Sequence, residues 1–416
     1  MRSRTLVALA VLFVVFGGLA VGGLVTERSS GTSLTMSWVS GTDRDIGGNH
    51  HAPAVARANE GWLVYAPVSG RSDTTGCALV ALDGATGEKR WDDGIPAPDC
   101  AIHSVADPTV ADYDGDGTAE VLVATTEERL AAHDPATGDV EFTYNLTNYG
   151  YTRPLVTDVT GDDRPEIVAV DVSGTVSVIR PDGTTVWERS LDAYTWGQPA
   201  VADFDGDGGQ EVAVAAGSAG ELHLFEHDGD RAWAEPTTFE GSITWMATGQ
   251  ADSDAATEIV VATAAGGRVA TIDGDGRTIW QRDFGSLAAV HNVTDGDRDG
   301  DSEVYAVDES GVLTALTATT GETEWTTTLT SADVQMMPPP DVGDVDGNDR
   351  PEIVAVTNDG RVSVVDPRSG AVLTTHEREA SIFTHPVLAD VDGDGAGEVF
   401  VMYADGRVAR FDVAPG

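Results

Sequence analysis

PVLADVDGDGAGE, residues 386–398, decides the fold that we expect for this chain. A short apolar segment leads into an acidic, glycine-rich loop, and the loop closes on a glutamate. The same frame returns in full at 108–120, 154–166 and 199–211, and in shorter form at 249–258, 294–303 and 343–352. Its closing glutamates lie 45 to 49 residues apart and are Glu120, Glu166, Glu211, Glu258, Glu303, Glu352 and Glu398. A period this regular is typical of a repeat architecture.

Each repeat contains four short segments rich in Val, Ile, Thr and Ala, separated by Gly, Asp and Asn. These are the residues of β-strands and tight turns, and four strands in a repeat of this length make one propeller blade. We therefore predict an all-β domain at 33–416, an eight-bladed β-propeller of four-stranded antiparallel blades. Seven blades is the alternative, because only seven repeats carry the acidic loop. The eight repeats begin near Pro53, Pro108, Pro154, Pro199, Met246, His291, Pro340 and Pro386.

The two ends of the domain complement each other. The last repeat stops after the second strand that follows its acidic loop, so it lacks its tryptophan-containing strand. The segment SLTMSWV at 33–39 contains Trp38 and has no repeat before it. We expect this segment to complete the last blade and close the ring, because closure removes free sheet edges.

The N-terminus predicts a membrane anchor. Arg2 and Arg4 precede twenty uncharged residues at 6–25, which is long enough to span a bilayer as a helix. The basic flank stays in the cytoplasm, so residues 1–25 would be a signal anchor, 26–32 a linker, and the propeller would lie outside a cell membrane crossed once. The alternative is a cleaved signal peptide and a secreted protein.

Acidic residues dominate the charge. The formal net charge is −45, and Lys89 is the single lysine. Such a surface repels nucleic acid, so we exclude nucleic acid as a partner. Spread acidity with almost no lysine is what we expect of a protein adapted to molar salt, and we interpret the chain as halophilic.

The acidic loops predict structural calcium sites. Carboxylates at positions 1, 3, 5 and 9 of a tight loop converge on one point, and Ca²⁺ takes six to eight oxygen ligands. Four loops carry all four carboxylates, and a fifth has an asparagine at position 5. The predicted ligands are Asp112, Asp114, Asp116, Glu120, Asp203, Asp205, Asp207, Glu211, Asp295, Asp297, Asp299, Glu303, Asp344, Asp346, Asn348, Glu352, Asp390, Asp392, Asp394 and Glu398.

Two further loops are weaker candidates for calcium. Thr160 replaces an aspartate in one of them, and Gln250 opens the other. The other interpretation of all the loops is that the turns of an acidic protein are simply rich in aspartate. The candidate ligands of the weaker loops are Asp158, Asp162, Glu166, Asp252, Asp254 and Glu258.

Two kinds of known propeller resemble these repeats. The acidic loops resemble the FG-GAP/VCBS calcium loops of integrin α-like propellers. The hairpins resemble the PQQ-type repeat of quinoprotein dehydrogenase-like propellers, with ALDGATGEKRW at 81–91, AHDPATGDVEF at 132–142 and ALTATTGETEW at 315–325. Together the resemblances cover about 33–416 and imply an eight-bladed propeller, and they imply little about activity.

The face opposite the acidic loops is the candidate ligand face. By up-and-down strand order, the acidic loops share one face with the hairpins, and the crossovers between blades share the other. The residues just before each inner strand are rich in aromatic side chains and histidine, which suits a concave binding site. The alternative is that they pack the central channel. The candidates are His51, His103, Tyr151, Arg153, Trp196, Trp245 and His385.

Five other side chains are also interpreted from the sequence. Cys77 and Cys100 fall on the same face of the first blade, and outside the cell they favour a disulfide over two free thiols. His133, His223 and His227 have no partner in the pattern and are interpreted as surface residues.

The sequence favours a non-catalytic function. No CxxCH, HExxH or nucleophile elbow occurs in it, and the vicinal cysteine pair of quinoprotein dehydrogenases is absent. We expect a binding or cell-envelope scaffold module with calcium as its cofactor and without PQQ, and with an unknown protein or glycan as its partner. The alternatives are an extracytoplasmic enzyme, either a quinoprotein-like dehydrogenase or a calcium-dependent polysaccharide lyase, and an envelope protein assembly factor.

Overall fold

The computed structural model describes residues 31–42, 48–58, 61–70 and 76–416, which belong to one compact unit, Gly31–Gly416. The predicted anchor at 1–25 and most of the predicted linker lie outside the described residues. Among the described residues, no helix is long and apolar enough to cross a membrane.

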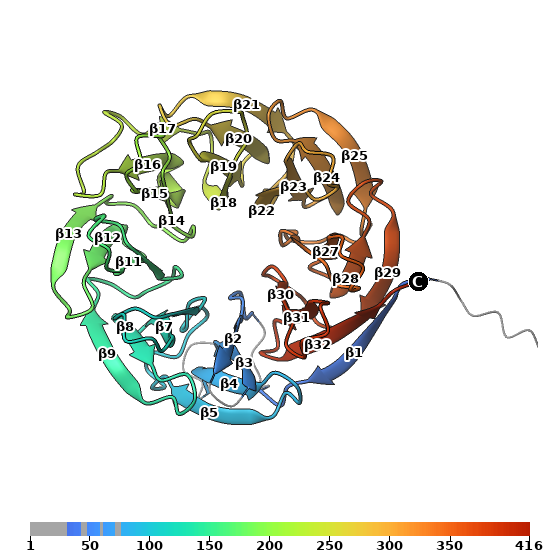
Figure 1. The fold of residues 1–416 in the computed structure, drawn as a ribbon, viewed down its shortest axis with the longest axis horizontal. Helices are drawn as coiled ribbons and strands as arrows, with labels where there is room; N and C mark the ends of the chain where they lie inside the picture. Colours follow the sequence, from blue (N-terminus) through green and yellow to red (C-terminus); the bar gives the residue numbers. More distant parts are fainter. Residues whose placement is uncertain (1–30, 43–47, 59–60, 71–75) are drawn as a thin grey trace, which may run out of the picture. The chain divides into compact units, whose positions relative to one another are not determined.

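Eight four-stranded antiparallel sheets surround a common axis in this unit, each with its first strand innermost (Figure 1). We number them as blades 1 to 8 along the chain. Blades 1 to 4 comprise β2 (Ala54–Ala58), β3 (Gly61–Val68), β4 (Ala78–Asp83) and β5 (Lys89–Gly94); β6 (Thr109–Ala111), β7 (Glu120–Thr125), β8 (Arg129–His133) and β9 (Val140–Asn145); β10 (Leu155–Thr157), β11 (Glu166–Val170), β12 (Thr175–Ile179) and β13 (Thr185–Ser190); and β14 (Ala200–Ala202), β15 (Glu211–Ala216), β16 (Glu221–Phe225) and β17 (Thr237–Thr238), with the short 3-10 turn η1 (Gly217–Ala219).

The second half of the ring repeats the same order. Blades 5 to 8 comprise β18 (Ile243–Gly249), β19 (Glu258–Thr263), β20 (Arg268–Ile272) and β21 (Thr278–Asp283); β22 (Ala288–Thr294), β23 (Glu303–Asp308), β24 (Val312–Thr317) and β25 (Thr323–Thr328); β26 (Asp341–Gly343), β27 (Glu352–Val356), β28 (Arg361–Val365) and β29 (Val372–Glu377); and β30 (Val387–Ala389), β31 (Glu398–Met402), β32 (Val408–Ala414) and the N-terminal β1 (Ser33–Val39).

The N-terminal strand closes the ring, as the sequence predicts. β1 pairs antiparallel with β32 from Ser33 opposite Ala414 to Val39 opposite Ala409, and Trp38 lies opposite Arg410. Figure 1 shows this junction of the first and last strands on the outer rim. The expectation of eight blades is confirmed and the alternative of seven is wrong, because the first repeat forms a complete blade without an acidic loop.

The core lies between blades. Second and third strands such as β11 and β12 are buried along their whole length, which explains their unbroken runs of Val, Ile and Ala. Their two faces pack against the two neighbouring sheets. Each of the eight interfaces between blades holds one cluster of buried apolar residues.

A tryptophan on one blade docks on the hairpin of the next. The indole N–H donates to a hairpin carbonyl, as from Trp91 to Pro135 at 3.0 Å and from Trp280 to Ala318 at 2.6 Å. Trp38 makes the same contact with Gly84 of blade 1 at 3.1 Å. The closing strand therefore repeats the interblade contact of the interior blades. The other tryptophans that do this are Trp187, Trp233 and Trp325.

Candidate functional site

The acidic loops share one geometry. In all seven, the main-chain N–H of the second loop residue donates to the closing glutamate, as from Phe204 to Glu211 at 2.8 Å. The first aspartate accepts main-chain N–H groups of the same loop, as Asp203 does from Gly206 at 2.7 Å and from Gly208 at 3.1 Å. The remaining bonds of the first kind are made by Tyr113, Val159, Ala251, Gly296, Val345 and Val391.

Six of the seven acidic loops have a left-handed backbone at positions 4 and 6. The loop at 250–258 differs, because Ser253 and Ala255 stand at these positions and neither has a positive φ. Gly206 has φ 77° and Gly208 has φ 92°. In three of the six loops a residue other than glycine keeps the shape: Asp163, Arg298 and Asp349 have φ of 65°, 61° and 62°. Such conformations cost non-glycine residues about 1–2 kcal/mol each. The loops therefore retain their form against a local cost, which indicates that the form itself matters.

Carboxylate oxygens converge inside several loops. In the loop of Asp295, four oxygens lie within 4.8 Å of one another, one from each predicted ligand. Asp116 and Asp207 are not among the converging residues of their loops, and each accepts a main-chain N–H from two residues further along, at 2.7 Å. The other converging groups are Asp112 with Asp114 and Glu120, Asp203 with Asp205 and Glu211, Asp252 with Asp254 and Glu258, and Asp344 with Asp346 and Glu352.

The electrostatics of these groups fit a cation. Burial and, to a smaller extent, neighbouring carboxylates raise the pKa of Glu120, Glu211, Glu303 and Glu352 to about 7, although a main-chain hydrogen bond lowers it. Glu211 Oε1 and Asp346 Oδ1 are buried without a hydrogen-bond partner. Asn348 donates to Glu352 Oε1 at 3.5 Å, and a flip of its amide would turn its oxygen toward the same point. The donor set is all oxygen, as Ca²⁺ requires.

The two weaker loops differ from each other. In the first, the Thr160 hydroxyl donates to Glu166 Oε1 at 3.1 Å, so a hydroxyl satisfies the glutamate there. In the second, the Gln250 amide donates to the main-chain carbonyls of Asp252 and Asp254 at 3.2 and 2.7 Å, which holds the loop closed. The geometry therefore favours the second loop over the first as a cation site.

An arginine enters the acidic loop of blade 8. Arg410 lies 3.2 Å from Glu398 Oε1 and 3.4 Å from Asp392 Oδ2, and it also contacts Asp412 at 3.0 Å. Its side chain is 8% exposed. The chain thus supplies its own cation to this loop, which contains Asp390 and Asp394. Sequence reasoning missed Arg410, because it lies on β32, the second strand after the loop along the chain.

A cavity of about 620 Å³ lies among the inner strands on the other face. Six of the seven predicted ligand-face residues line it, and the seventh, His103, contacts two of them. Asp107 and His291 also line it and were not predicted. Asp107 had a signal in the sequence, since it stands directly before a repeat's proline, as Arg153 and His385 do. The predicted residues in the lining are His51, Tyr151, Arg153, Trp196, Trp245 and His385.

Asp107 organises one wall of the cavity. Its Oδ1 accepts from His51 Nδ1 at 2.8 Å and from the Ala52 N–H at 2.9 Å, and its Oδ2 accepts from Gln198 at 2.9 Å. Burial opposes the charge of Asp107, but the hydrogen bond from His51 and the nearby His51, His385 and Arg153 together outweigh burial and lower the pKa of the carboxyl. A buried carboxylate is thus fixed by donors that directly precede the inner strands of blades 1 and 4.

Two histidine rings stack on the wall of the cavity opposite Asp107. His291 and His385 lie 4.1 Å apart between ring centroids, with an interplanar angle of 23°. Burial, and secondly the positive field of His385, lowers the pKa of His291 well below its usual value. Its Nδ1 has no hydrogen-bond partner. This wall is therefore neutral at pH 7 at His291 and offers an unused nitrogen.

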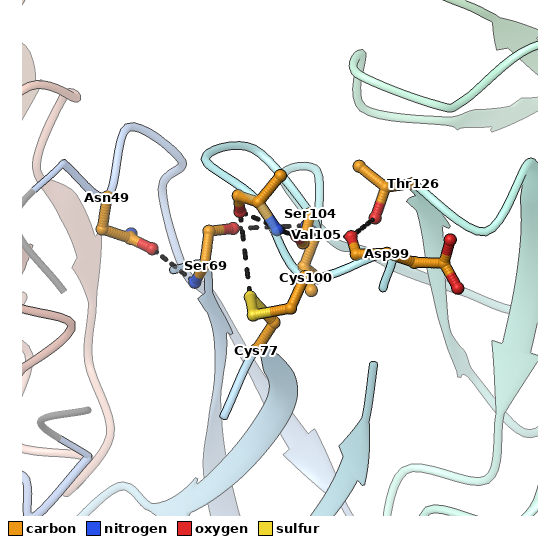
Figure 2. Close-up of a disulfide and its surroundings, with 9 residues drawn as sticks. Asn49, Ser69, Cys77, Asp99, Cys100, Ser104, Val105 and Thr126 are labelled. Carbon is orange, nitrogen blue, oxygen red and sulfur yellow. Dashed lines mark hydrogen bonds between the residues drawn. A yellow bond between two sulfur atoms is a disulfide. The ribbon is translucent and has the colours of Figure 1, made fainter. Parts of the chain in front are cut away.

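Cys77 and Cys100 form a disulfide in the buried cluster between blades 1 and 2. Figure 2 shows how it fixes the crossover between β5 and β6 to blade 1, next to Ser69. The Val105 N–H donates to Ser69 Oγ at 3.3 Å, and the Ser69 N–H donates to Asn49 at 2.8 Å. The disulfide and these bonds hold the crossover that carries His103 and Asp107.

Two family models match the sequence. One, described as outer membrane protein assembly factor BamB, matches residues 28–160 and 266–416. The other, described as an FG-GAP-like repeat, matches residues 158–214. These are the two kinds of repeat that the hairpins and the acidic loops resemble, so that resemblance is confirmed. No curated protein matches the sequence significantly.

Several solved structures match this chain over nearly their whole length. The biofilm matrix protein Bap1 of V. cholerae is 14% identical, with a TM-score of 0.66 over 92% of this chain and 91% of that one. BamB from Moraxella catarrhalis is 18% identical, with 0.59 over 91% and 97%. The computationally designed protein Ika8 is 14% identical, with 0.61 over 89% and 99%. Identities this low show the fold alone.

Proposed function

Because the chain belongs to the family described as outer membrane protein assembly factor BamB, we propose that it is a non-catalytic binding and assembly module of a cell envelope. Its partner would be another envelope protein, bound at the crossover face. The cavity of about 620 Å³ at this face carries the proposal, because it brings together the aromatic and histidine side chains that precede the inner strands.

Exposed apolar side chains on the crossovers support this face as the binding surface. Ile102 is 43% exposed beside His103, and Tyr194 is 46% exposed and packs on Trp196 with 5.3 Å between ring centroids. Tyrosine and tryptophan are enriched where proteins bind one another, because one part of each ring system is apolar and another forms hydrogen bonds. We propose that these residues form the centre of the interface.

We also propose that the propeller works outside the cell. Residues 6–25 would hold it at the outer side of the membrane, and the disulfide between Cys77 and Cys100 suits an oxidising compartment. Cell fractionation tests the anchor. An anchored chain should be found intact in the membrane fraction, whereas a secreted protein would be found in the medium.

The acidic loops, we propose, bind calcium and brace the blades. The FG-GAP-like match, the converging oxygens and the buried unpaired Glu211 Oε1 support this role. Glu211 closes its loop at the first residue of β15, so a bound ion would tie the loop to the sheet. Calcium that binds only the folded chain would raise its stability.

Affinity capture from envelope extracts tests the binding function. Ile102→Ala combined with Tyr194→Ala should release the partner, whereas the wild-type chain should retain it. Val140→Ala with Ile279→Ala is the matched control, because these exposed apolar residues lie on the outer strands β9 and β21. Equal capture by all three chains would contradict the proposal. Dye reduction after addition of PQQ, or cleavage of surface polysaccharide, would favour an enzyme.

Metal analysis of the purified chain tests calcium binding. After chelation and dialysis into calcium, the chain should hold several ions, and Glu211→Gln should hold one fewer. Glu226→Gln serves as the control, because Glu226 lies in the adjacent hairpin and outside the group of converging oxygens. A calcium content equal in all three chains, or none at all, would show that the loops are only acidic turns.

A further inference from the structure

Three histidines, one tyrosine and one aspartate form a continuous cluster at the mouth of the cavity. They come from three crossovers: His50 and His51 precede β2, His103 and Asp107 precede β6, and Tyr151 precedes β10. His103 has a left-handed backbone, φ 68°, which is uncommon outside glycine and is typical of functional sites when the surroundings enforce it.

The positions of the hydrogen atoms in this cluster follow from the carboxylate. Asp107 accepts from His51 Nδ1 at 2.8 Å, so the lone pair of His51 is on Nε2. His103 Nδ1 lies 3.2 Å from that nitrogen and must be the donor. The lone pair of His103 is therefore on Nε2, which is oriented away from His51.

Two groups compete for this single lone pair. His50 Nδ1 lies 3.2 Å from His103 Nε2, and the Tyr151 hydroxyl lies 3.3 Å from the same atom. One imidazole lone pair accepts one hydrogen atom well, so the hydroxyl and the His50 ring cannot both be satisfied by it. If the Tyr151 hydroxyl donates to His103 Nε2, His50 Nδ1 faces a nitrogen whose lone pair is already used. A cation between the two nitrogens removes the conflict, because it uses both lone pairs.

We propose that His50 Nδ1 and His103 Nε2 bind one transition-metal ion, such as Zn²⁺ or Cu²⁺, with the Tyr151 oxygen beside it. Two nitrogens at 2.0–2.1 Å from a tetrahedral ion lie roughly 3.3 Å apart, close to the observed 3.2 Å. Imidazole nitrogen selects such ions over Ca²⁺, which takes oxygen. The remaining coordination positions face the cavity and would take a donor atom from a bound partner.

Surrounding groups hold the two ligands in place. Phe383 packs edge-on against the His50 ring at 4.3 Å between centroids. His51 and Asp107 are positioning residues, since their hydrogen bonds fix the tautomer and orientation of His103, as carboxylates behind metal-bound histidines do. Burial is the main cause that lowers the pKa of His50, to about 4, so its ring is neutral at pH 7.

Calorimetric titration of the full, untagged chain with Zn²⁺ in saturating calcium tests the site. Calcium occupies the acidic loops, so the remaining binding should be one equivalent. His103→Asn keeps a residue type that tolerates the left-handed backbone and should weaken Zn²⁺ binding at least tenfold. His50→Ala should do the same, and it decides the matter if the first variant fails to fold. Co²⁺ added in place of Zn²⁺ should give the visible absorption of a nitrogen-ligated ion.

Two controls separate this site from the rest of the chain. His227→Asn removes an exposed histidine of a hairpin and should leave Zn²⁺ affinity unchanged. Tyr151→Phe should have a smaller effect than either histidine variant. The proposal is overturned if the wild-type chain takes up no Zn²⁺ in excess calcium, or if His103→Asn and His50→Ala both bind it as the wild type does.

Discussion

The closing glutamates of the acidic loops experience two opposing influences. Each one starts a buried strand, and its carboxyl faces aspartates of its own loop, as Glu303 faces Asp297. Without a cation, the folded chain prefers these groups protonated. Calcium bound as proposed would replace the proton. The same residues would then couple stability to both pH and calcium.

The pH dependence of stability should reveal this coupling. Burial raises the pKa of Glu120, Glu211, Glu303 and Glu352 to about 7 in the folded chain, above the value of about 4.3 for an unfolded glutamate. Between these values the folded state binds protons that the unfolded state has released, so stability is lost as pH rises through about 7. In chelator the melting temperature should fall from pH 5 to pH 8, and excess calcium should reduce the fall. An identical fall with and without calcium would contradict this.

Arg410 should act as an internal substitute for calcium in blade 8. Arg410→Gln leaves Glu398 and Asp392 without their partner, which should cost roughly 3 kcal/mol in chelator. The emptied loop should then bind calcium more tightly than in the wild type. Chemical denaturation with and without calcium measures both effects. If calcium restores none of the lost stability, Arg410 has only a packing role.

At the scale of elements, neighbouring blades are joined where the indole of a tryptophan on one blade packs against a glycine in the hairpin of the next. A Cβ at Gly321 would lie 2.4 Å from the Trp280 ring, and Gly321 has φ 65°. Trp280→Phe should cost about 1 kcal/mol for its lost hydrogen bond, and Gly321→Ala about 3 kcal/mol through overpacking and backbone strain. Gly183→Ala is the control: its φ is 83°, but its Cβ would lie 3.7 Å from Phe142. Equal losses at both glycines would refute the docking role.

The disulfide is an element-scale constraint on the crossover of His103. It closes a loop with a sequence separation of 23, for which chain entropy predicts about 3 kcal/mol of stabilisation. Cys77→Ser with Cys100→Ser should lower the unfolding free energy by about this amount in urea. Reductant should shift the wild-type chain to the same value and leave the variant unchanged. A loss below about 1 kcal/mol would mean that Ser69 and its hydrogen bonds suffice.

The sequence predicts elements better than it predicts directions of side chains. The spacing of the closing glutamates and the missing last strand predict eight blades and the pairing of β1 with β32, because a period and a vacancy are both visible along the chain. His133 and His223 were predicted at the surface and are 0% and 5% exposed, so that prediction was wrong. His133 stacks on Trp91 of the neighbouring blade. Contacts of this kind depend on strand register between blades, which no local pattern contains.

At the scale of the whole molecule, the ring holds together against its own charge. The 69 acidic and 24 basic residues give a formal net charge of −45. Each interface between blades is apolar, whereas the exposed surface of the blades is strongly acidic. Repulsion among exposed carboxylates opposes every interface at once, because the ring is closed and its interfaces form together.

Salt should therefore stabilise the entire ring. The Debye length falls from about 10 Å at 0.1 M to about 3 Å at 1 M, which screens repulsion between surface carboxylates. With calcium present, the melting temperature should rise steadily from 0.1 M to about 2 M KCl. A chain with Glu141, Glu235, Glu240 and Asp333 all replaced by Lys should melt higher at low salt and gain less from KCl, since all four residues are exposed. If both chains respond equally, the salt acts through apolar burial. A melting temperature that falls with KCl would show that ion pairs within the ring outweigh the repulsion between its carboxylates.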